Sequence, residues 1–158
     1  MVRLKVRYLV GKIQFEDGKV DINLKHWEIP YELEWSMQNL YGQYGVAVYL
    51  RGIGVKYVNP FTGMFFLKCK RDFHKQLHAA LTSMTLFKKQ RCNIQVLHMA
   101  ATLKRAEQWL LNYNKKEMSR MYKESKTPLE RQEILGAAKK LGIENLLHFE
   151  KKDNEEVG

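Results

Sequence analysis

The chain has 158 residues, of which 45% are hydrophobic and 11% aromatic, so it can fold around one apolar core. Lys and Arg outnumber Asp and Glu by 27 to 17, a formal net charge of +10, which favours a polyanionic partner such as nucleic acid or an anionic membrane surface. No apolar run approaches the roughly 20 residues that cross a bilayer. Two cysteines make a disulfide framework improbable, so we expect a soluble protein in a reducing compartment.

The positive charge is unevenly distributed along the chain. Residues 1–15 carry four basic residues and no acid, and residues 35–126 carry sixteen basic residues and four acids. Residues 16–34 instead hold six acids and two lysines, and the part after Thr127 holds seven acids and five bases. Such a local excess predicts a basic binding face formed by the first strand and the middle of the chain.

The first element that the pattern predicts is a strand over residues 2–15. Apolar and polar residues alternate there, which is typical of a half-buried strand. The apolar positions run from Val2 to Val10 on one face. Three cations therefore project from the other face: Arg3, Lys5 and Arg7.

The later elements follow from helical periodicity, turn residues and capping residues. In chain order they are a turn at 16–19, a helix from Pro30 to between Gly42 and Gly45, a strand over 46–57, a turn at 59–63, a strand over 64–70, a helix over 72–87, a basic loop at 88–91, a strand over 93–101, a helix capped by Thr102 and running to 123, and a helix capped by Thr127 and ended by Gly142.

The order β-α-β-β-α-β predicts an α+β fold, an RRM-like or ferredoxin-like α/β sandwich with additional C-terminal helices. Its four-stranded sheet is antiparallel, with two helices on one face, and the extra helices could cover part of the other. We expect a domain over residues 1–123, a helical extension over 124–149 and an acidic tail over 150–158.

Side-chain spacing bears on both metal binding and catalysis. Cys69, His74, His78 and Cys92 offer four soft ligands, with the two histidines four residues apart, but no CxxC pair is present, so buried thiols and surface histidines are favoured over zinc. No nucleophile–base or carboxylate cluster is visible. We therefore predict no catalytic residue and no metal ligand.

The predicted third strand lies where RNA-recognition domains carry their base-stacking motif. Residues 63–69 resemble that motif weakly, since Met64 and Cys69 stand where aromatic residues are wanted, and Phe65 and Phe66 are interpreted as core. Recognition of backbone and shape by cations is favoured instead. The candidate phosphate-binding residues are Arg3, Lys5, Arg7, Lys56, Lys68, Lys70, Arg71, Lys104 and Arg105.

Several segments together resemble the Pop-five/Rpp-fourteen family of ribonuclease P and ribonuclease MRP protein subunits. The resemblance spans about residues 1–115. Its segments are Met1 to Leu9, Tyr44-Gly45, Val55-Lys56-Tyr57, Asn59, Thr62-Gly63, Leu67-Lys68-Cys69-Lys70, Phe73, Leu97-His98, Thr102-Leu103-Lys104, Gln108 and Tyr113-Asn114.

The resemblance implies an RRM-like domain that binds the core of a large catalytic RNA and pairs with the Rpp-thirty (Rpp-one) subunit and other holoenzyme proteins. It adds Tyr57, Asn59 and Thr62 to the expected RNA-binding residues. The RNA would cut, removing 5′ leaders from precursor tRNA or processing precursor rRNA. The protein would bind no cofactor, Mg²⁺ would lie at the RNA active site, and no membrane would be involved. The expected location is the nucleus and nucleolus, or the cytoplasm of an archaeon.

Two other classes of function stay open at this point. A stand-alone RRM-like or ribosome-associated protein that binds single-stranded RNA would carry stacking aromatics, which are mostly missing. An autonomous enzyme of the acylphosphatase kind would need a glycine-rich phosphate loop ending in Arg near the first helix. Residues 16–30 contain no such loop.

Overall fold

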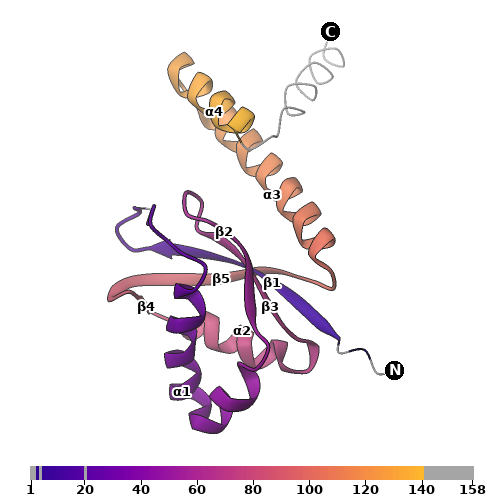
Figure 1. Ribbon diagram of the computed structural model, residues 1–158. Helices are drawn as coiled ribbons and strands as arrows, with labels where there is room; N and C mark the ends of the chain where they lie inside the picture. Colours follow the sequence, from indigo (N-terminus) through magenta and orange to yellow (C-terminus); the bar gives the residue numbers. More distant parts are fainter. Residues whose placement is uncertain (1–2, 4, 20, 141–158) are drawn as a thin grey trace. The chain divides into compact units, whose positions relative to one another are not determined.

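A computed structural model of the chain describes residues 3, 5–19 and 21–140. The chain divides into two compact units, and the boundary along the sequence falls between Ala106 and Glu107. The first unit contains the sheet and two helices (Figure 1). The predicted acidic tail, the helix end at Gly142 and the start of the first strand at Val2 lie outside the described residues.

The helices and strands follow one another in the predicted split order, with one short strand added. They are β1 (Val6–Phe15), α1 (Glu28–Tyr49), β2 (Gly54–Asn59), β3 (Met64–Lys70), the 3₁₀ turn η1 (Arg71–Phe73), α2 (His74–Ser83), β4 (Leu86–Phe87), β5 (Gln90–Ala100), α3 (Leu103–Glu124) and α4 (Pro128–Lys140).

The sheet has the strand order β2-β3-β1-β5-β4, and every neighbouring pair is antiparallel. Its central strand, β1, pairs with β3 on one side and with β5 on the other, with a bulge between Val10 and Gly11 in the pairing with β5. The α+β fold expected from the sequence is confirmed. The four long strands form the predicted antiparallel sheet, and β4 extends it at one edge.

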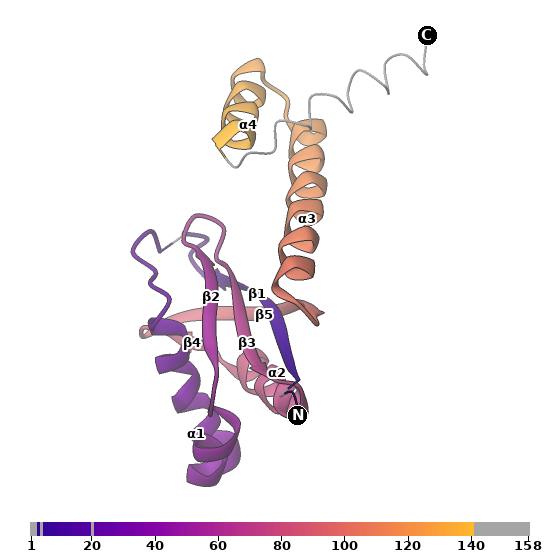
Figure 2. The same ribbon diagram turned by 45° about the vertical axis from the view of Figure 1, so that its right-hand side comes forward.

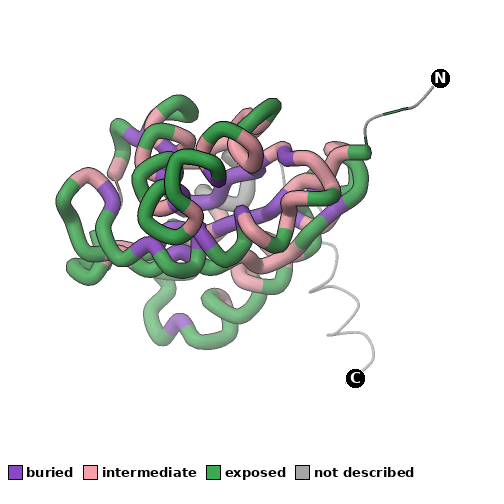
Figure 3. The backbone as a smooth tube through the Cα atoms, turned by 90° about the horizontal axis from the view of Figure 1, so that it is seen from below, coloured by how far each residue is buried: buried purple, intermediate pink, exposed green. Residues whose placement is uncertain are grey.

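Helices α1 and α2 lie against the same face of the sheet, as Figures 1 and 2 show. Leu9 and Ile13 of β1 and Leu67 of β3 point into the layer between sheet and helices. They meet apolar side chains such as Leu33 of α1 and Leu77 of α2, each fully buried. Figure 3 shows buried residues gathered in the interior of this unit. Each such side chain contributes on the order of 2 kcal/mol through burial.

The turn between β2 and β3 forms where Asn59 to Gly63 were predicted to turn. The Phe61 amide donates to Oδ1 of Asn59 at 3.0 Å, and the Gly63 amide donates to the Asn59 carbonyl at 2.9 Å. Gly63 has a φ of 72°, a conformation that glycine adopts without steric cost. A side chain there would also collide with Ile13, so the turn fits against the central strand.

Residues 46–49 were predicted to begin a strand, and this prediction was wrong because they end α1. Gly42 interrupts the helix with non-helical angles, but helical structure resumes and continues to Tyr49. The Tyr49 ring lies 5.2 Å from that of Tyr41 and 5.1 Å from that of Phe73. These tertiary contacts outweigh the strand preference of the local Val-Ala-Val sequence. The helix also begins at Glu28, so Pro30 falls within its first turn.

The predicted helix over 72–87 is shorter than expected. A 3₁₀ turn precedes it, and the helix ends at Ser83, after which Met84 is extended and Leu86 and Phe87 form β4. The predicted basic loop is a two-residue hairpin turn, Lys88-Lys89, with positive φ at both residues. Glycine and asparagine usually mark such turns, so a lysine pair gave no signal.

The second unit contains the remainder of α3 and α4. The predicted caps at both helix starts are confirmed: the Arg105 amide, in the first unit, donates to Oγ1 of Thr102 at 3.2 Å, and the Glu130 amide donates to Oγ1 of Thr127 at 3.3 Å. The Arg131 guanidinium lies 5.4 Å from the centre of the Tyr122 ring. The predicted division of the chain at residue 123 stays a prediction.

Among the described helices, none has the length and apolar character that crossing a membrane requires.

Candidate nucleic-acid interface

The sheet has a second face, opposite α1 and α2. Side chains alternate along a strand, so the even-numbered residues of β1 project to this face while Leu9 and Ile13 project to the helices. The pairing register places the following side chains on this second face: Val6, Tyr8, Val10, Lys12 and Gln14 of β1, Tyr57 and Asn59 of β2, Met64, Phe66, Lys68 and Lys70 of β3, and Asn93, Gln95, His98 and Ala100 of β5. Among these described residues none is acidic.

The middle of the second face is apolar. Val10, Met64, Phe66 and Ala100 are all buried there. The Tyr57 ring covers Phe66, with 4.9 Å between ring centres. Phe65 and Phe66 are therefore both core residues, as predicted, one on each side of the sheet. Phe66 offers no free surface on which a base could stack.

Lysines stand at both ends of the apolar middle. Lys12 pairs in register with Met64, whereas Lys68 lies opposite Tyr8 and Lys70 opposite Val6. Four residues of strand separate the Lys12 and Lys68 positions, which corresponds to about 13 Å. All three are half-buried, and among the described residues none of the three has a carboxylate partner. Their charges are thus available to an external anion.

Lys104 and Arg105 stand near the same end of the sheet as Lys68. They follow Ala100 by four and five residues, and Ala100 pairs with Tyr8, the residue opposite Lys68. Both are exposed in the first turn of α3. The structure therefore brings cations from the predicted set together from β3 and α3.

The three predicted cations of the first strand are placed differently. Arg7 lies opposite Cys69 on the helix-covered face, and its guanidinium donates to the Val6 carbonyl at 2.8 Å. Burial raises the pKa of the Cys69 thiol to about 11, although the positive charge of Arg7 acts in the other direction. Arg3 and Lys5 precede β1 and are exposed. As predicted, Val6 and Val10 lie on the face of β1 opposite that of Arg7. The helices, however, cover the face of Arg7 and not the face of Val6 and Val10.

The remaining predicted residues lie along the hairpin. Lys56 is exposed on β2, where the pairing shifts between Val55 and Tyr57. Arg71 pairs with Asp72 at 3.5 Å. The Asn59 carboxamide oxygen already accepts a bond within its own turn. The Asn59 side chain therefore stabilises the hairpin turn. Lys56, which is exposed, is more available to an external anion than Arg71 is.

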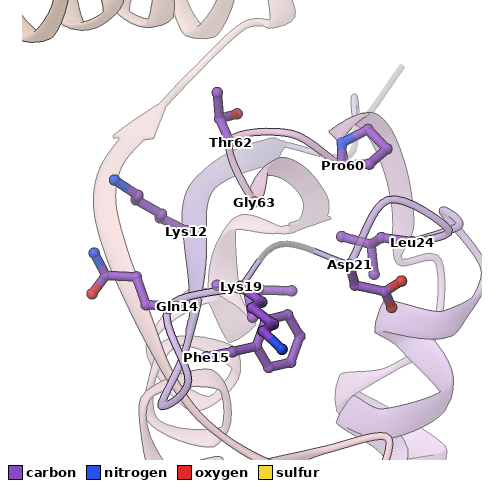
Figure 4. A pocket seen from close by; sticks show the side chains of 11 residues that line it. Lys12, Gln14, Phe15, Lys19, Asp21, Leu24, Pro60, Thr62 and Gly63 are labelled. Atoms are coloured by element: carbon purple, nitrogen blue, oxygen red, sulfur yellow. The ribbon is translucent and has the colours of Figure 1, made fainter.

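A pocket of about 420 Å³ adjoins the second face where the hairpin tip meets β1. Figure 4 shows Lys12, Thr62 and Lys19 among the side chains that line it. Thr62 belonged to the predicted set, but Lys12 did not. The signal that could have found Lys12 is its even position in β1, which it shares with Tyr8.

The four potential metal ligands lie on β3, α2 and β5. Cys69 is buried in β3, and Cys92 is half-buried in β5 with its thiol pKa raised by burial and by the nearby charge of Glu32. Nδ1 of His74 donates to the Arg71 carbonyl at 2.5 Å, and His78 is exposed. Over the described part of the chain, His, Cys, Asp and Glu side chains form no group of three or more that could hold a metal ion.

The fold and this face define a small α+β domain with a split β-α-β sheet and a cationic face suited to a polyanion. The model of the Rpp14/Pop5 family matches residues 7–111, which is most of the described chain. The chain belongs to the Rpp14/Pop5 family.

The chain is also similar to individual proteins over most of its length. The ribonuclease P/MRP protein subunit POP5 of Danio rerio is 27% identical over 160 residues, covering 97% of this chain and 94% of the relative. The POP5 subunit of Homo sapiens is 25% identical and covers 75% of each chain. A chain in the cryo-EM structure of yeast ribonuclease MRP matches with a TM-score of 0.47 and 9% identity, covering 76% of this chain and 96% of that one.

Proposed function

We propose that this chain is a non-catalytic protein subunit of ribonuclease P, and also of ribonuclease MRP, that binds the RNA and stabilises its fold. The observation that carries the proposal is the second face, where Lys12, Lys68 and Lys70 have no carboxylate ion-pair partner among the described residues, in a chain of the Rpp14/Pop5 family. Relatives named as ribonuclease P/MRP subunits support the same assignment.

The proposed action is electrostatic. Folded RNA brings phosphates close together, and their repulsion must be offset by Mg²⁺ or by fixed cations. Lysines held on a rigid sheet supply positive charge at fixed spacing and release condensed counterions when they bind. Attachment of this kind positions the protein without reading the base sequence. In this proposal the RNA performs the cleavage with Mg²⁺ at its own active site, and the protein holds no cofactor.

The partners and location belong to the same proposal. The RNA would be the main partner, the Rpp-thirty subunit would bind as a neighbouring protein, and precursor tRNA would be contacted indirectly. The protein would reside in the nucleus and nucleolus, or in the cytoplasm of an archaeal cell. A fluorescent fusion expressed in the source cell tests the location.

The functional test is cleavage of precursor tRNA by a particle reconstituted from the RNA and its protein subunits, measured across a Mg²⁺ titration. Two double charge reversals separate the two cationic groups: K68E/K70E on the second face and R3E/K5E in the exposed segment before β1, with Arg7 kept because it lies on the helix-covered face. The matched control is K75E, a reversal at an exposed lysine of α2 on the opposite side of the sheet.

Both reversals should raise the Mg²⁺ concentration that gives half-maximal cleavage, whereas K75E should leave it unchanged. If neither reversal alters the Mg²⁺ requirement, the cations do not stabilise the RNA. Cleavage by the purified protein in the absence of RNA would also refute the assignment, because it would place catalysis in the polypeptide.

A further inference from the structure

Helix α1 carries three large aromatic side chains on its solvent side. Trp27, at the N-cap, is 55% exposed, and Tyr31 and Trp35 are each 69% exposed. They are spaced by four residues, so they line up along one side of the helix. We call these three residues the aromatic stripe.

The stripe faces away from the protein core. The buried residues in this part of α1 are Ile29, Leu33 and Met37. Their middle member, Leu33, follows Tyr31 by two residues, which is about 200° around a helix. The aromatic side chains therefore contribute little to the core of this unit, where polar residues would be the ordinary choice.

The stripe is a sizeable apolar patch. At these exposed fractions the three side chains present about 400 Å² of largely apolar surface. That is about the size of the largest apolar patch on a typical monomer, a patch that is often functional. It is about half of what one partner contributes to a standard protein interface, roughly 800 Å².

A groove next to the stripe extends the apolar surface. It has a volume of about 370 Å³ and lies between α1 and the segment that leads into β4. Trp35 and Leu40 line it from α1, and Met84 and Leu86 line it from the other side. Leu40 is 48% exposed and Leu86 54% exposed. Stripe and groove together could receive a partner's apolar side chains.

The charge around the stripe determines what kind of partner fits. Glu32 and Lys89 line the groove, and Glu34 is exposed beside the stripe. Lys88 offsets Asp21 and Glu28, but residues 16–34 as a whole carry six acids against two lysines. This surface is therefore less favourable to RNA than the cationic second face. The same acidic excess disfavours the end of this chain, since residues 143–158 carry five acids and two lysines, and disfavours a second copy docked through the same face.

We propose that the aromatic stripe and its groove form the docking surface for another protein of the ribonucleoprotein, one that presents apolar side chains flanked by Lys or Arg. The inference rests on the proposed function, since it assumes the same particle. It assigns the acidic α1 side to protein and the cationic second face to RNA. Trp27 and Trp35 would act as the buried anchors of the contact.

Site-specific photocrosslinking in the assembled particle tests this assignment. The full chain is produced with p-benzoylphenylalanine in place of Tyr31, or in place of Lys68 on the second face. A third version carries it in place of Tyr44, a control that is equally exposed, at 70%, but lies beyond the helix interruption at Gly42. After irradiation, crosslinked peptides and nucleotides are identified by mass spectrometry.

The Tyr31 position should crosslink to a different protein, within a peptide rich in Lys or Arg, at least tenfold more than the Tyr44 position does. A crosslink from Tyr31 to RNA or to a second copy of this chain, or no crosslink at all, overturns the docking surface. The Lys68 position reports separately on the proposed function, because it should crosslink to RNA. Failure there, with a protein crosslink from Tyr31, would reject the RNA contact and leave the docking surface standing.

A substitution pair supplies an independent measurement. Tyr31→Lys should weaken binding of the crosslinked partner at least tenfold, and Tyr44→Lys should change it less than twofold. Both positions are exposed, so both variants should keep the unfolding temperature and the RNA affinity of the parent chain. Equal effects of the two variants on partner binding would contradict the assignment.

Discussion

The ammonium nitrogen of Lys88 lies 2.6 Å from a carboxylate oxygen of Glu28. The same nitrogen lies 2.9 Å from Asp21, so one lysine ties the turn between β4 and β5 to the loop before α1 and to the first turn of that helix. The side chain of Lys88 is 33% exposed, that of Glu28 13% and that of Asp21 21%, so water screens the two ion pairs only in part. The same Glu28 carboxylate accepts the Lys25 amide at 2.9 Å, which fixes the start of α1.

Replacing Lys88 should therefore destabilise the fold. Lys88→Met leaves two partly buried carboxylates without their shared cation, and we expect a loss of about 1–2 kcal/mol in the free energy of unfolding. The neighbouring Lys89→Met is a matched control, because Lys89 has the same positive φ in the same turn but is exposed and has no carboxylate partner among the described residues. Urea unfolding measures both, and equal losses would show that charge or turn strain, and not the pairing, is responsible.

The same pairs predict how stability depends on pH. The hydrogen bond from Lys88 lowers the pKa of Asp21 below its ordinary value of 3.8, so the stabilisation is present above that value and is lost as the pH falls through the lowered pKa. The pKa of Lys88 is raised above 10.5: burial alone would lower it, but the bonds to Glu28 and Asp21 prevail. Its stabilisation is present below 10.5 and is lost as the pH rises through the raised pKa.

The difference in unfolding free energy between the parent chain and Lys88→Met should thus be largest between roughly pH 4 and pH 10 and should shrink on either side. Urea midpoints measured from pH 2.5 to pH 11 give the profile. A difference that stays constant down to pH 2.5 would mean that Asp21 does not contribute through its charge.

Gly63 offers a second stability test at the hairpin tip. Gly63 has a φ of 72°, and an added Cβ would collide with the backbone oxygen of Ile13, whose amide donates to the Gly63 carbonyl at 2.9 Å. Gly63→Ala should cost about 2–4 kcal/mol, because both the left-handed conformation and the collision with the central strand must be relieved. Gly18 has a φ of 69° and nothing within 4 Å, so Gly18→Ala should cost only about 1 kcal/mol. Urea unfolding of the two variants tests the difference, and equal costs would argue against the close approach to Ile13.

The sequence predicted the fold because its strongest signals were local and consistent. The order of strands and helices, the turn at Asn59 to Gly63 and the caps at Thr102 and Thr127 all depend on neighbouring residues. Errors arose where tertiary contacts decide. The end of α1 at Tyr49 depends on packing against Phe73, which is distant in sequence, and the short strand β4 depends on a lysine turn that pairing with Asp21 and Glu28 supports.

The candidate interface was only partly visible in the sequence. Charge counting found Lys68 and Lys70, but β1 is apolar at odd and even positions alike, since Leu9 and Val10 are both buried. Alternation alone therefore could not show which face of β1 the helices cover. As a result Lys12 was missed, and Arg7 was grouped with Lys68 and Lys70, which lie on the other side of the sheet. The aromatic stripe of α1 was missed for a similar reason, because the exposed side of a helix is known only once its packing partner is.

The remaining prediction concerns the mode of RNA binding. If the second face neutralises phosphates, each lost lysine contact should lower the slope of log affinity against log salt by about 0.7–0.9. For K68A/K70A we expect a slope smaller by about 1.5 and RNA binding weakened about tenfold near 0.15 M salt. K75A on α2 should change neither quantity. Fluorescence anisotropy with the ribonuclease P RNA, at several KCl concentrations, measures both.

Tyr8 separates this mode from base stacking, because it lies directly opposite Lys68 on the same face. Loss of a stacked base costs about 1–3 kcal/mol and leaves the salt dependence intact. For backbone recognition, Tyr8→Ala should reduce affinity less than K68A/K70A and should do so equally for RNAs of different sequence. A large loss that depends on base sequence, with an unchanged salt slope for K68A/K70A, would mean that the sheet reads single-stranded bases and that the lysines serve only as a solvated rim.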